Sequence, residues 1–193
     1  TRWQQQYQLD VQHLNVGGGI GVNYTDLSDV FNWPVFCTEL TALIEQKAMQ
    51  NTQIRFECGR FISAACGYYC MQVLDIKQSY DETFVIGRGG THHFRTPAAQ
   101  SHSHPFSICQ AEESVGQLSQ EVQPQVSQPE VKNQKVTIVG QLCTPKDILA
   151  KQQLVQQLAV GDFVVFSHAG AYGWNISHQN FLMHEKPHWV FLG

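Results

Sequence analysis

Three consecutive glycines stand where a short apolar strand is expected to end. Leu14 and Val16 are apolar, and Gly17, Gly18 and Gly19 follow them directly. Residues without a Cβ let several backbone N–H groups converge on one anion, as binding of a phosphate requires. The glycines therefore indicate a phosphate-binding loop, although an ordinary flexible turn is the simpler interpretation of this stretch on its own.

A carboxylate, a glycine and an arginine follow the next expected strand. Residues 53–56 form this short strand, and Glu57, Gly59 and Arg60 come after it. Parallel α/β proteins hold their ligands at the carboxyl ends of their strands. We therefore expect an acid, a bare backbone N–H and a guanidinium beside the glycine loop. An ion pair of Glu57 with Arg60 or Arg55 is the alternative.

The elements that must position these residues form a strand–helix–strand unit. A polar helix tail is expected near the N-terminus, followed by a strand over 9–16. Ser28 or Asp29 is the expected helix cap. A set of downstream apolar residues has helical spacing and predicts an amphipathic helix: Phe36, Leu40, Leu43, Ile44 and Ala48. Together with the strand over 53–56, they predict a parallel unit.

The remainder of the chain has the pattern of a β-domain. Tyr69, Met71 and Val73 alternate with polar residues, which predicts a half-buried strand. Glycine and proline punctuation favours an antiparallel sheet, as in a small barrel. Further strands are expected at five places: 84–86, 93–95, 135–141, 162–167 and 188–192.

Two segments interrupt these strands. Asp147 is expected to cap a helix that carries apolar residues at 148, 149, 154 and 158. The interval near 110–134 is rich in Gln, Glu, Ser and Pro, and it is expected to be a mobile surface insertion.

Composition excludes several functional classes. A net charge of −4 and a pI near 6.1 argue against binding of nucleic acid. No apolar run approaches the roughly 20 residues that span a bilayer, and no leader opens the sequence. The six cysteines are scattered without a C-x-x-C pair, which favours reduced thiols, a cytoplasmic location and no metal site.

The order of these landmarks resembles the pyridoxal-phosphate decarboxylases of the alanine-racemase-like fold, the ornithine and diaminopimelate decarboxylase family. In that family a Gly-Gly-Gly loop and a Glu-Pro-Gly-Arg element hold the cofactor, and Cys58 replaces the proline here. The resemblance implies the C-terminal end of a (β/α)8 barrel over residues 1–66. An antiparallel β-barrel domain over residues 67–193 follows it.

The resemblance also implies roles for the site residues. Glu57 keeps the pyridine nitrogen of pyridoxal 5′-phosphate protonated. Gly17, Gly18, Gly19, Gly59 and Arg60 hold the phosphate, and Tyr172 lies over the cofactor. Cys143 enters the site across a homodimer interface and protonates the substrate carbon after carbon dioxide leaves. Packing in the β-domain core is the alternative for Tyr172 and Cys143.

Two departures from the family bear on the substrate. Relatives that act on small diamino acids carry a carboxylate directly after the cysteine, where this chain has Thr144. The stretch 88–95 instead brings two arginines and two histidines, with His102 and His104 close behind. Loss of an acid and gain of cations suggest a substrate with distal carboxylates, bound by Arg95. The amino-acid sequences of these stretches resemble those of the family branch that decarboxylates citrate-conjugated amino acids in siderophore biosynthesis.

The resemblance implies a homodimeric decarboxylase that acts on a small-molecule amino acid. If this substrate is not a citrate conjugate, a diaminopimelate-like substrate is implied. The family lysine that binds the cofactor lies on a first barrel strand, which does not precede Thr1, so this chain alone is expected to be inactive. A racemase of the same fold is disfavoured by Glu57. A non-catalytic regulatory homologue is disfavoured by the joint presence of Glu57, Arg60, Cys143 and Tyr172. A free-standing β-barrel binding module leaves the first strand–helix–strand unexplained.

Overall fold

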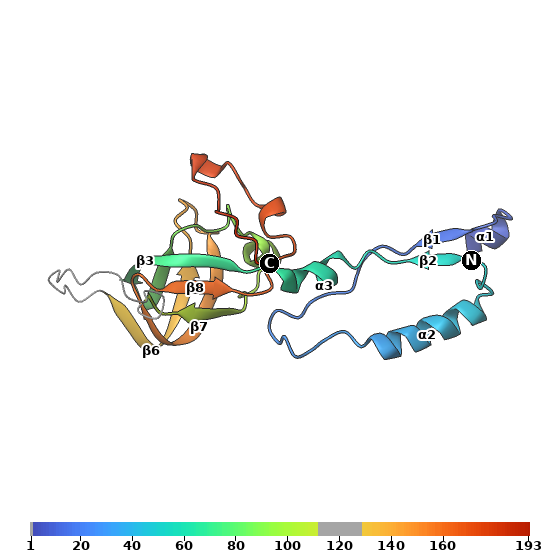
Figure 1. The fold of residues 1–193 in the computed structure, drawn as a ribbon, viewed down its shortest axis with the longest axis horizontal. Coiled ribbons are helices and arrows are strands. Elements are labelled where there is room, and N and C mark those ends of the chain that lie inside the picture. Colours follow the sequence, from blue (N-terminus) through green and yellow to red (C-terminus); the bar gives the residue numbers. More distant parts are fainter. Residues whose placement is uncertain (1, 112–128) are drawn as a thin grey trace. The chain divides into compact units, whose positions relative to one another are not determined.

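The computed structural model describes residues 2–111 and 129–193. The chain divides into two compact units, Thr1–Ile62 and Ser63–Gly193. The first contains a helix between two short strands, and the second contains the large sheet (Figure 1). Each unit is described by itself below.

The first unit is built around a pair of parallel strands. After helix α1 (Arg2–Gln6), strand β1 (His13–Asn15) pairs with β2 (Gln53–Arg55), and Leu14 lies opposite Ile54. Helix α2 (Trp33–Gln46) connects the two strands. The predicted strand–helix–strand order is therefore confirmed, and both strands end at the same edge.

The cap of α2 differs from the prediction. The side chain of Asn32 accepts the N–H of Val35 at 3.1 Å, and a proline follows in the first turn. Ser28 and Asp29 are engaged elsewhere, since Ser28 donates its hydroxyl to Asp26 and Asp29 accepts from an asparagine amide. The expected cap at Ser28 or Asp29 was therefore wrong by one helical turn.

The first unit buries little of itself. Within its described residues, Tyr24 and Cys58 are buried, and α2 has no buried residue. Val35 and Leu43 on α2 are about half exposed, at 50% and 49%. Two strands are too few to bury the apolar face of α2, which would be covered in a complete α/β layer.

The second unit carries a six-stranded mixed sheet. Its order is β5-β8-β3-β4-β6-β7. All neighbouring strands are antiparallel except β4 and β6, which are parallel. The predicted purely antiparallel sheet was therefore wrong at this pair. The strands are β3 (Tyr69–Ser79), β4 (Glu82–Gly87), β5 (Phe106–Cys109), β6 (Glu130–Val139), β7 (Ile148–Ala159) and β8 (Phe163–Phe166).

Contacts ahead of β5 bring the two sheet edges together. The N–H of His104 donates to the carbonyl of Leu149 at 3.1 Å, and the N–H of Lys151 donates to the hydroxyl of Ser103 at 2.9 Å. These bonds join the start of β5 to β7, so the sheet is a nearly closed barrel (Figure 1). Fully buried Val85, Ile138 and Phe166 lie in its core.

Short helices complete the two units. Helix α3 (Gly59–Ser63) and the turn η1 (Ala64–Cys66) connect β2 to β3. Helix α4 (Thr96–Gln100) precedes β5. The turns η2 (Trp174–Ile176) and η3 (Phe181–Met183) follow β8.

Several expected elements were wrong. The helix expected after Asp147 is strand β7, paired with β6 over most of its length. Residues 93–95 form a turn ahead of α4, and residues 188–192 have no regular structure. Of the insertion expected near 110–134, residues 112–128 lie outside the described part, and residues 130–134 belong to β6. Among described residues, no helix is long and apolar enough to span a membrane.

Candidate functional site

The glycine loop and the loop that follows β2 are in direct contact. The N–H of Val16 donates to the carbonyl of Arg55 at 3.0 Å, and the N–H of Glu57 donates to the carbonyl of Gly17 at 2.7 Å. The parallel ladder thus continues past the end of each strand. These bonds bring Glu57 to the opening of the glycine bend, as the sequence predicted.

The Glu57 side chain is held by an asparagine that sequence reasoning missed. Asn15 donates its amide N–H to the Glu57 carboxylate at 2.7 Å, and its carbonyl oxygen accepts the N–H of Gly17 at 2.8 Å. Arg55 donates to Gln53 instead of pairing with Glu57. A polar residue between apolar Leu14 and Val16 was the available signal for Asn15.

The glycine loop presents backbone donors at an exposed position. Gly17 and Gly19 have φ angles of +80° and +106°, which favour glycine. A Cβ on Gly18 would lie 3.0 Å from the carbonyl oxygen of Glu57. Within the described residues, the N–H groups of Gly18 and Gly19 donate to no acceptor. The loop can therefore direct donors at an anion.

Arg60 lies against a buried tyrosine. Its guanidinium donates to the Tyr24 hydroxyl at 3.3 Å and lies 5.9 Å from the centre of that ring. Gly59 precedes it at the start of α3. Tyr24, which sequence reasoning missed, orients this cation in the same unit as the glycine loop.

In the second unit, Asp147 joins two loops instead of capping a helix. Its carboxylate is buried and accepts the N–H of Thr91 at 2.6 Å and the N–H of Leu142 at 2.9 Å. A Cβ on Gly90 would lie 2.6 Å from this carboxylate. The loop carrying Thr91 and the loop that begins at Gly140 are therefore fixed side by side.

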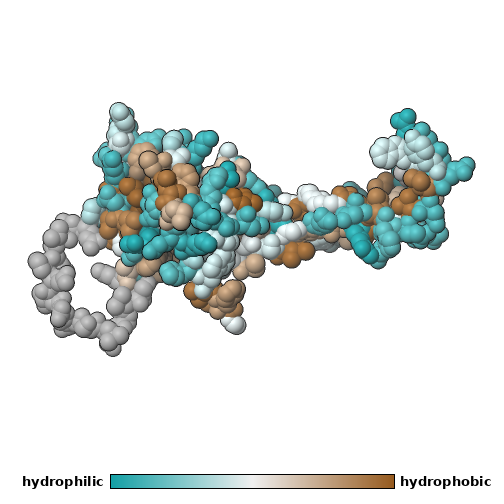
Figure 2. Space-filling view, turned by 90° about the horizontal axis from the view of Figure 1, so that it is seen from above, coloured by the Kyte–Doolittle hydropathy of each residue, from teal (hydrophilic) through white to brown (hydrophobic). Residues whose placement is uncertain are grey.

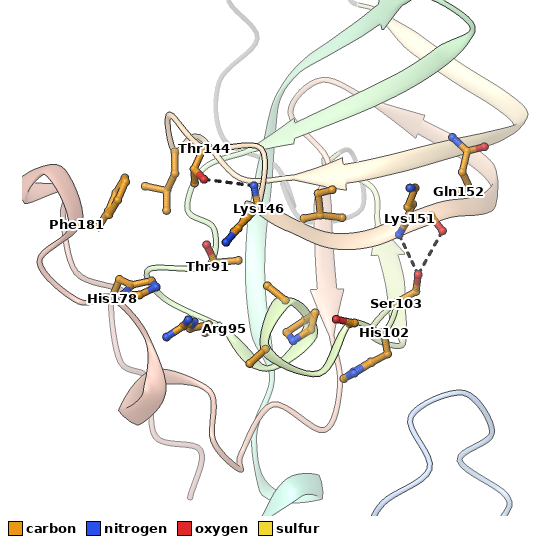
Figure 3. A pocket seen from close by; sticks show the side chains of 16 residues that line it. Thr91, Arg95, His102, Ser103, Thr144, Lys146, Lys151, Gln152, His178 and Phe181 are labelled. Atoms are coloured by element: carbon orange, nitrogen blue, oxygen red, sulfur yellow. Dashed lines mark hydrogen bonds between the residues drawn. The ribbon is translucent and has the colours of Figure 1, made fainter.

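Beside this junction lies a cavity of about 960 Å³. Arg95, Thr144 and Lys146 line one end, together with Thr91 and His178, whereas Ser103 and Lys151 lie at the other (Figure 3). The Arg95 guanidinium also donates to the carbonyl of Ile176 at 3.4 Å. The structure therefore brings Arg95 and Thr144 together, and it adds two lysines that sequence reasoning did not select.

Cys143 and Tyr172 also lie in the second unit. Cys143 is exposed and adjoins Thr144. Tyr172 is 43% exposed, with its backbone carbonyl accepting the hydroxyl of buried Thr96 at 2.8 Å. Neither residue is in the core of the second unit, so the packing alternative was wrong for both.

The histidines divide by environment. His92 and His104 are buried, and burial lowers the pKa of each to about 4. His104 donates from Nε2 to the carbonyl of Ser167 at 2.7 Å, and its Nδ1 lies 3.0 Å from Nε2 of His102. No group of three His, Cys, Asp or Glu residues in the described ranges is arranged to hold a metal ion.

Comparisons with known proteins place these features in a family. Residues 14–170 match the family described as "Pyridoxal-dependent decarboxylase, C-terminal sheet domain". The chain is 42% identical over 190 residues to a 2-[(L-alanin-3-ylcarbamoyl)methyl]-2-hydroxybutanedioate decarboxylase of Staphylococcus aureus, covering 98% of this chain and 46% of the relative. It is 31% identical to an L-glutamyl-[BtrI acyl-carrier protein] decarboxylase of Niallia circulans, covering 95% of this chain and 41% of the relative.

A solved structure shows the same fold. Diaminopimelate decarboxylase from Helicobacter pylori, complexed with L-lysine, superposes with a TM-score of 0.70 at 23% identity. The match covers 92% of this chain and 39% of that one. The chain thus spans less than half the length of these relatives. By the match over residues 14–170, the chain belongs to the pyridoxal-dependent decarboxylase family.

Proposed function

We propose that this chain supplies the C-terminal part of an amino-acid decarboxylase that uses pyridoxal 5′-phosphate. The observation that carries the proposal is the contact between the glycine loop and the loop bearing Glu57, joined by Asn15. It combines an anion-binding edge with a carboxylate in one place. Because the matched relatives are about twice as long, the activity is proposed for a protein that also contains the remainder of the barrel.

The residues present fit the cofactor. Unused N–H groups of Gly18 and Gly19 suit its phosphate, Gly17 and Gly59 let the two loops approach it, and Arg60 supplies a cation. When bound, the cofactor supplies an electron sink for the carbanion left by the departing carboxyl group.

Each remaining site residue has one task in the proposal. Glu57 holds a proton at the pyridine nitrogen, because a neighbouring carboxylate favours the charged form. Tyr172 would contact the bound cofactor. Cys143 gives a proton to the substrate carbon, and its exposure suits that role. Arg95 binds the substrate.

We assign the first unit to a larger barrel. Residues 1–66 form the end of a (β/α)8 barrel, and residues 67–193 form the C-terminal β-barrel domain. The parallel pair β1–β2 and the uncovered face of α2 support this assignment. More strands and helices are needed to bury that helix face.

The enzyme functions as a cytoplasmic homodimer with its active site at the interface. Apolar residues remain on the surface of the second unit, which is otherwise largely hydrophilic (Figure 2). Their exposed fractions reach 90% at Phe191 and 84% at Met183. Burial of such side chains against a second copy favours association.

The substrate is an amino acid conjugated to citrate, as in siderophore biosynthesis. The 42% identity to the Staphylococcus aureus decarboxylase supports this branch, and so does Thr144 where diamino-acid enzymes carry a carboxylate. A diaminopimelate-like substrate is the second candidate, because several relatives carry that name.

The test is carbon dioxide release by the full-length protein saturated with cofactor. We expect turnover of 2-[(L-alanin-3-ylcarbamoyl)methyl]-2-hydroxybutanedioate and little with meso-diaminopimelate. Glu57→Gln is expected to lower kcat at least roughly a hundredfold, because the ring nitrogen then loses its carboxylate partner. Glu45→Gln, an exposed carboxylate on α2, is the control. Full turnover by Glu57→Gln would contradict the assignment.

A further inference from the structure

The cavity in the second unit has an uncompensated positive lining. Three of its sixteen lining residues carry a permanent positive charge, Arg95, Lys146 and Lys151, and none is an aspartate or a glutamate. Asp147 adjoins Lys146 in sequence, but both of its carboxylate oxygens accept backbone N–H groups of the loop junction. Three cations outweigh this one neighbouring carboxylate, so the cavity is net positive and attracts anions.

The two cations at one end come from separate segments that the fold fixes together. Arg95 precedes α4, and Lys146 lies in the loop between β6 and β7 (Figure 3). Asp147 holds these segments in register through Thr91 and Leu142. Thr144 also lines this end, and its hydroxyl accepts the N–H of Lys146 at 3.3 Å. The loop junction therefore holds together the backbones that carry the two cations.

We propose that Lys146 is a specificity-determining residue, which binds a compact polycarboxylate together with Arg95 at this end of the cavity. Two cations on adjacent loops suit a ligand with two or more carboxylates on a small carbon frame. The volume of about 960 Å³ is ample for such a molecule. The apolar floor from Leu142, Ile148 and Phe181 accommodates its carbon chain.

This inference rests on the proposed function only in identifying the ligand with the distal end of the substrate. Binding itself requires neither cofactor nor turnover. Its failure and the failure of the decarboxylase assignment are therefore separable, because each is measured in a different assay.

Citrate binding to the full-length protein tests the inference by titration calorimetry and by amide chemical-shift changes. We expect saturable binding with shifts at the residues that line the cavity. Lys146→Gln and Arg95→Gln are each expected to weaken it roughly tenfold, as for loss of one charge-assisted contact. Lys146→Arg retains binding. Lys135→Gln, an exposed lysine on β6 outside the cavity, leaves it unchanged.

Other results would overturn the inference. They are an absence of citrate binding by the wild-type chain, unaltered binding by Lys146→Gln, and equal loss with Lys135→Gln. Propane-1,2,3-tricarboxylate is expected to compete with citrate, whereas acetate and sulfate are not. Equal competition by sulfate identifies a general anion effect and rejects the polycarboxylate site. Thermal unfolding of each variant confirms that the compared chains are folded.

Discussion

The side-chain amide of Asn15 lies 2.7 Å from the carboxylate of Glu57, across the edge where β1 and β2 end. The same side chain accepts the N–H of Gly17. One residue thereby sets the orientation of the acid and the start of the glycine bend. Glu57 is exposed, so its orientation depends on this bond more than on packing.

Replacement of Asn15 by leucine is expected to weaken cofactor binding by the full-length enzyme. The substitution keeps the approximate size and removes both hydrogen bonds, including one to a charged group that contributes about 1.5–3 kcal/mol. The dissociation constant should rise roughly tenfold or more, as measured by cofactor fluorescence. Asn51→Leu, at an exposed turn, is the control. Unchanged affinity in Asn15→Leu would show that Glu57 is oriented without it.

Asp147→Asn is expected to destabilise the second unit by about 1–3 kcal/mol, as for a buried group left without its partner. An amide has one acceptor oxygen, so either the N–H of Thr91 or that of Leu142 loses its acceptor. Urea denaturation of the chain measures the change. Asp81→Asn, which alters an exposed carboxylate, should change stability by less than about 0.5 kcal/mol. Equal stability of the two variants would argue against a structural role for Asp147.

The stability of the chain is expected to fall as the pH drops from about 6.5 to about 4. Burial lowers the pKa of His104 to about 4 in the folded state, against about 6.5 for a solvent-exposed histidine. The unfolded chain therefore binds a proton in this window that the folded chain does not, so folding loses free energy as pH decreases. For one histidine the loss between pH 7 and pH 5 is about 2 kcal/mol.

Denaturation of His104→Gln at both pH values checks this assignment. The loss of stability between pH 7 and pH 5 should shrink by about 2 kcal/mol, because the titrating group is absent. Burial also lowers the pKa of His92 to about 4, so some pH dependence remains in the variant. His188→Gln removes an exposed histidine and should leave the wild-type difference intact. An unaltered difference in His104→Gln would reject the role of this side chain.

Thr144→Glu is expected to shift the preference of the full-length enzyme toward diamino acids. Thr144 lines the cavity beside Lys146, so a carboxylate there repels distal carboxylates and attracts a distal ammonium. The ratio of kcat/KM for the citrate conjugate over meso-diaminopimelate should fall at least roughly tenfold. Thr144→Ser retains a neutral hydroxyl and should preserve the ratio. If Thr144→Glu also leaves this ratio unchanged, the distal end of the substrate binds elsewhere.

Local patterns predicted the first unit better than the sheet. Residues at helical spacing and the glycines after Val16 gave α2 and the parallel pair, because each signal lies within one element. Strand β7 was mistaken for a helix because its buried positions are irregular: Leu149, Ala150, Val155 and Leu158. Register shifts against β6 and a φ of +51° at Gln152 break the two-residue period. Pairing with β6 overrides the local sequence there.

Predictions for the site divided in the same way. Glu57 and its glycine neighbours were predictable, because a parallel pair brings two consecutive strand ends together. Lys146 and the role of Asp147 were not, because they depend on contact between loops 56 residues apart in sequence. The stretch 88–95 suggested that His92 is one of the gained cations, yet it is buried. Which histidines are shielded from solvent depends on the tertiary packing of the barrel.

The parallel neighbours β4 and β6 have a consequence for how this family can diversify. Two strands running the same way cannot be joined by a tight hairpin, so the chain must travel back before β6 begins. Thr91 and Arg95 lie on the first part of this connection, between β4 and β5, and they are not in a strand. Exchange of residues 88–102 between relatives should therefore transfer ligand preference while the strands of the parent barrel are retained.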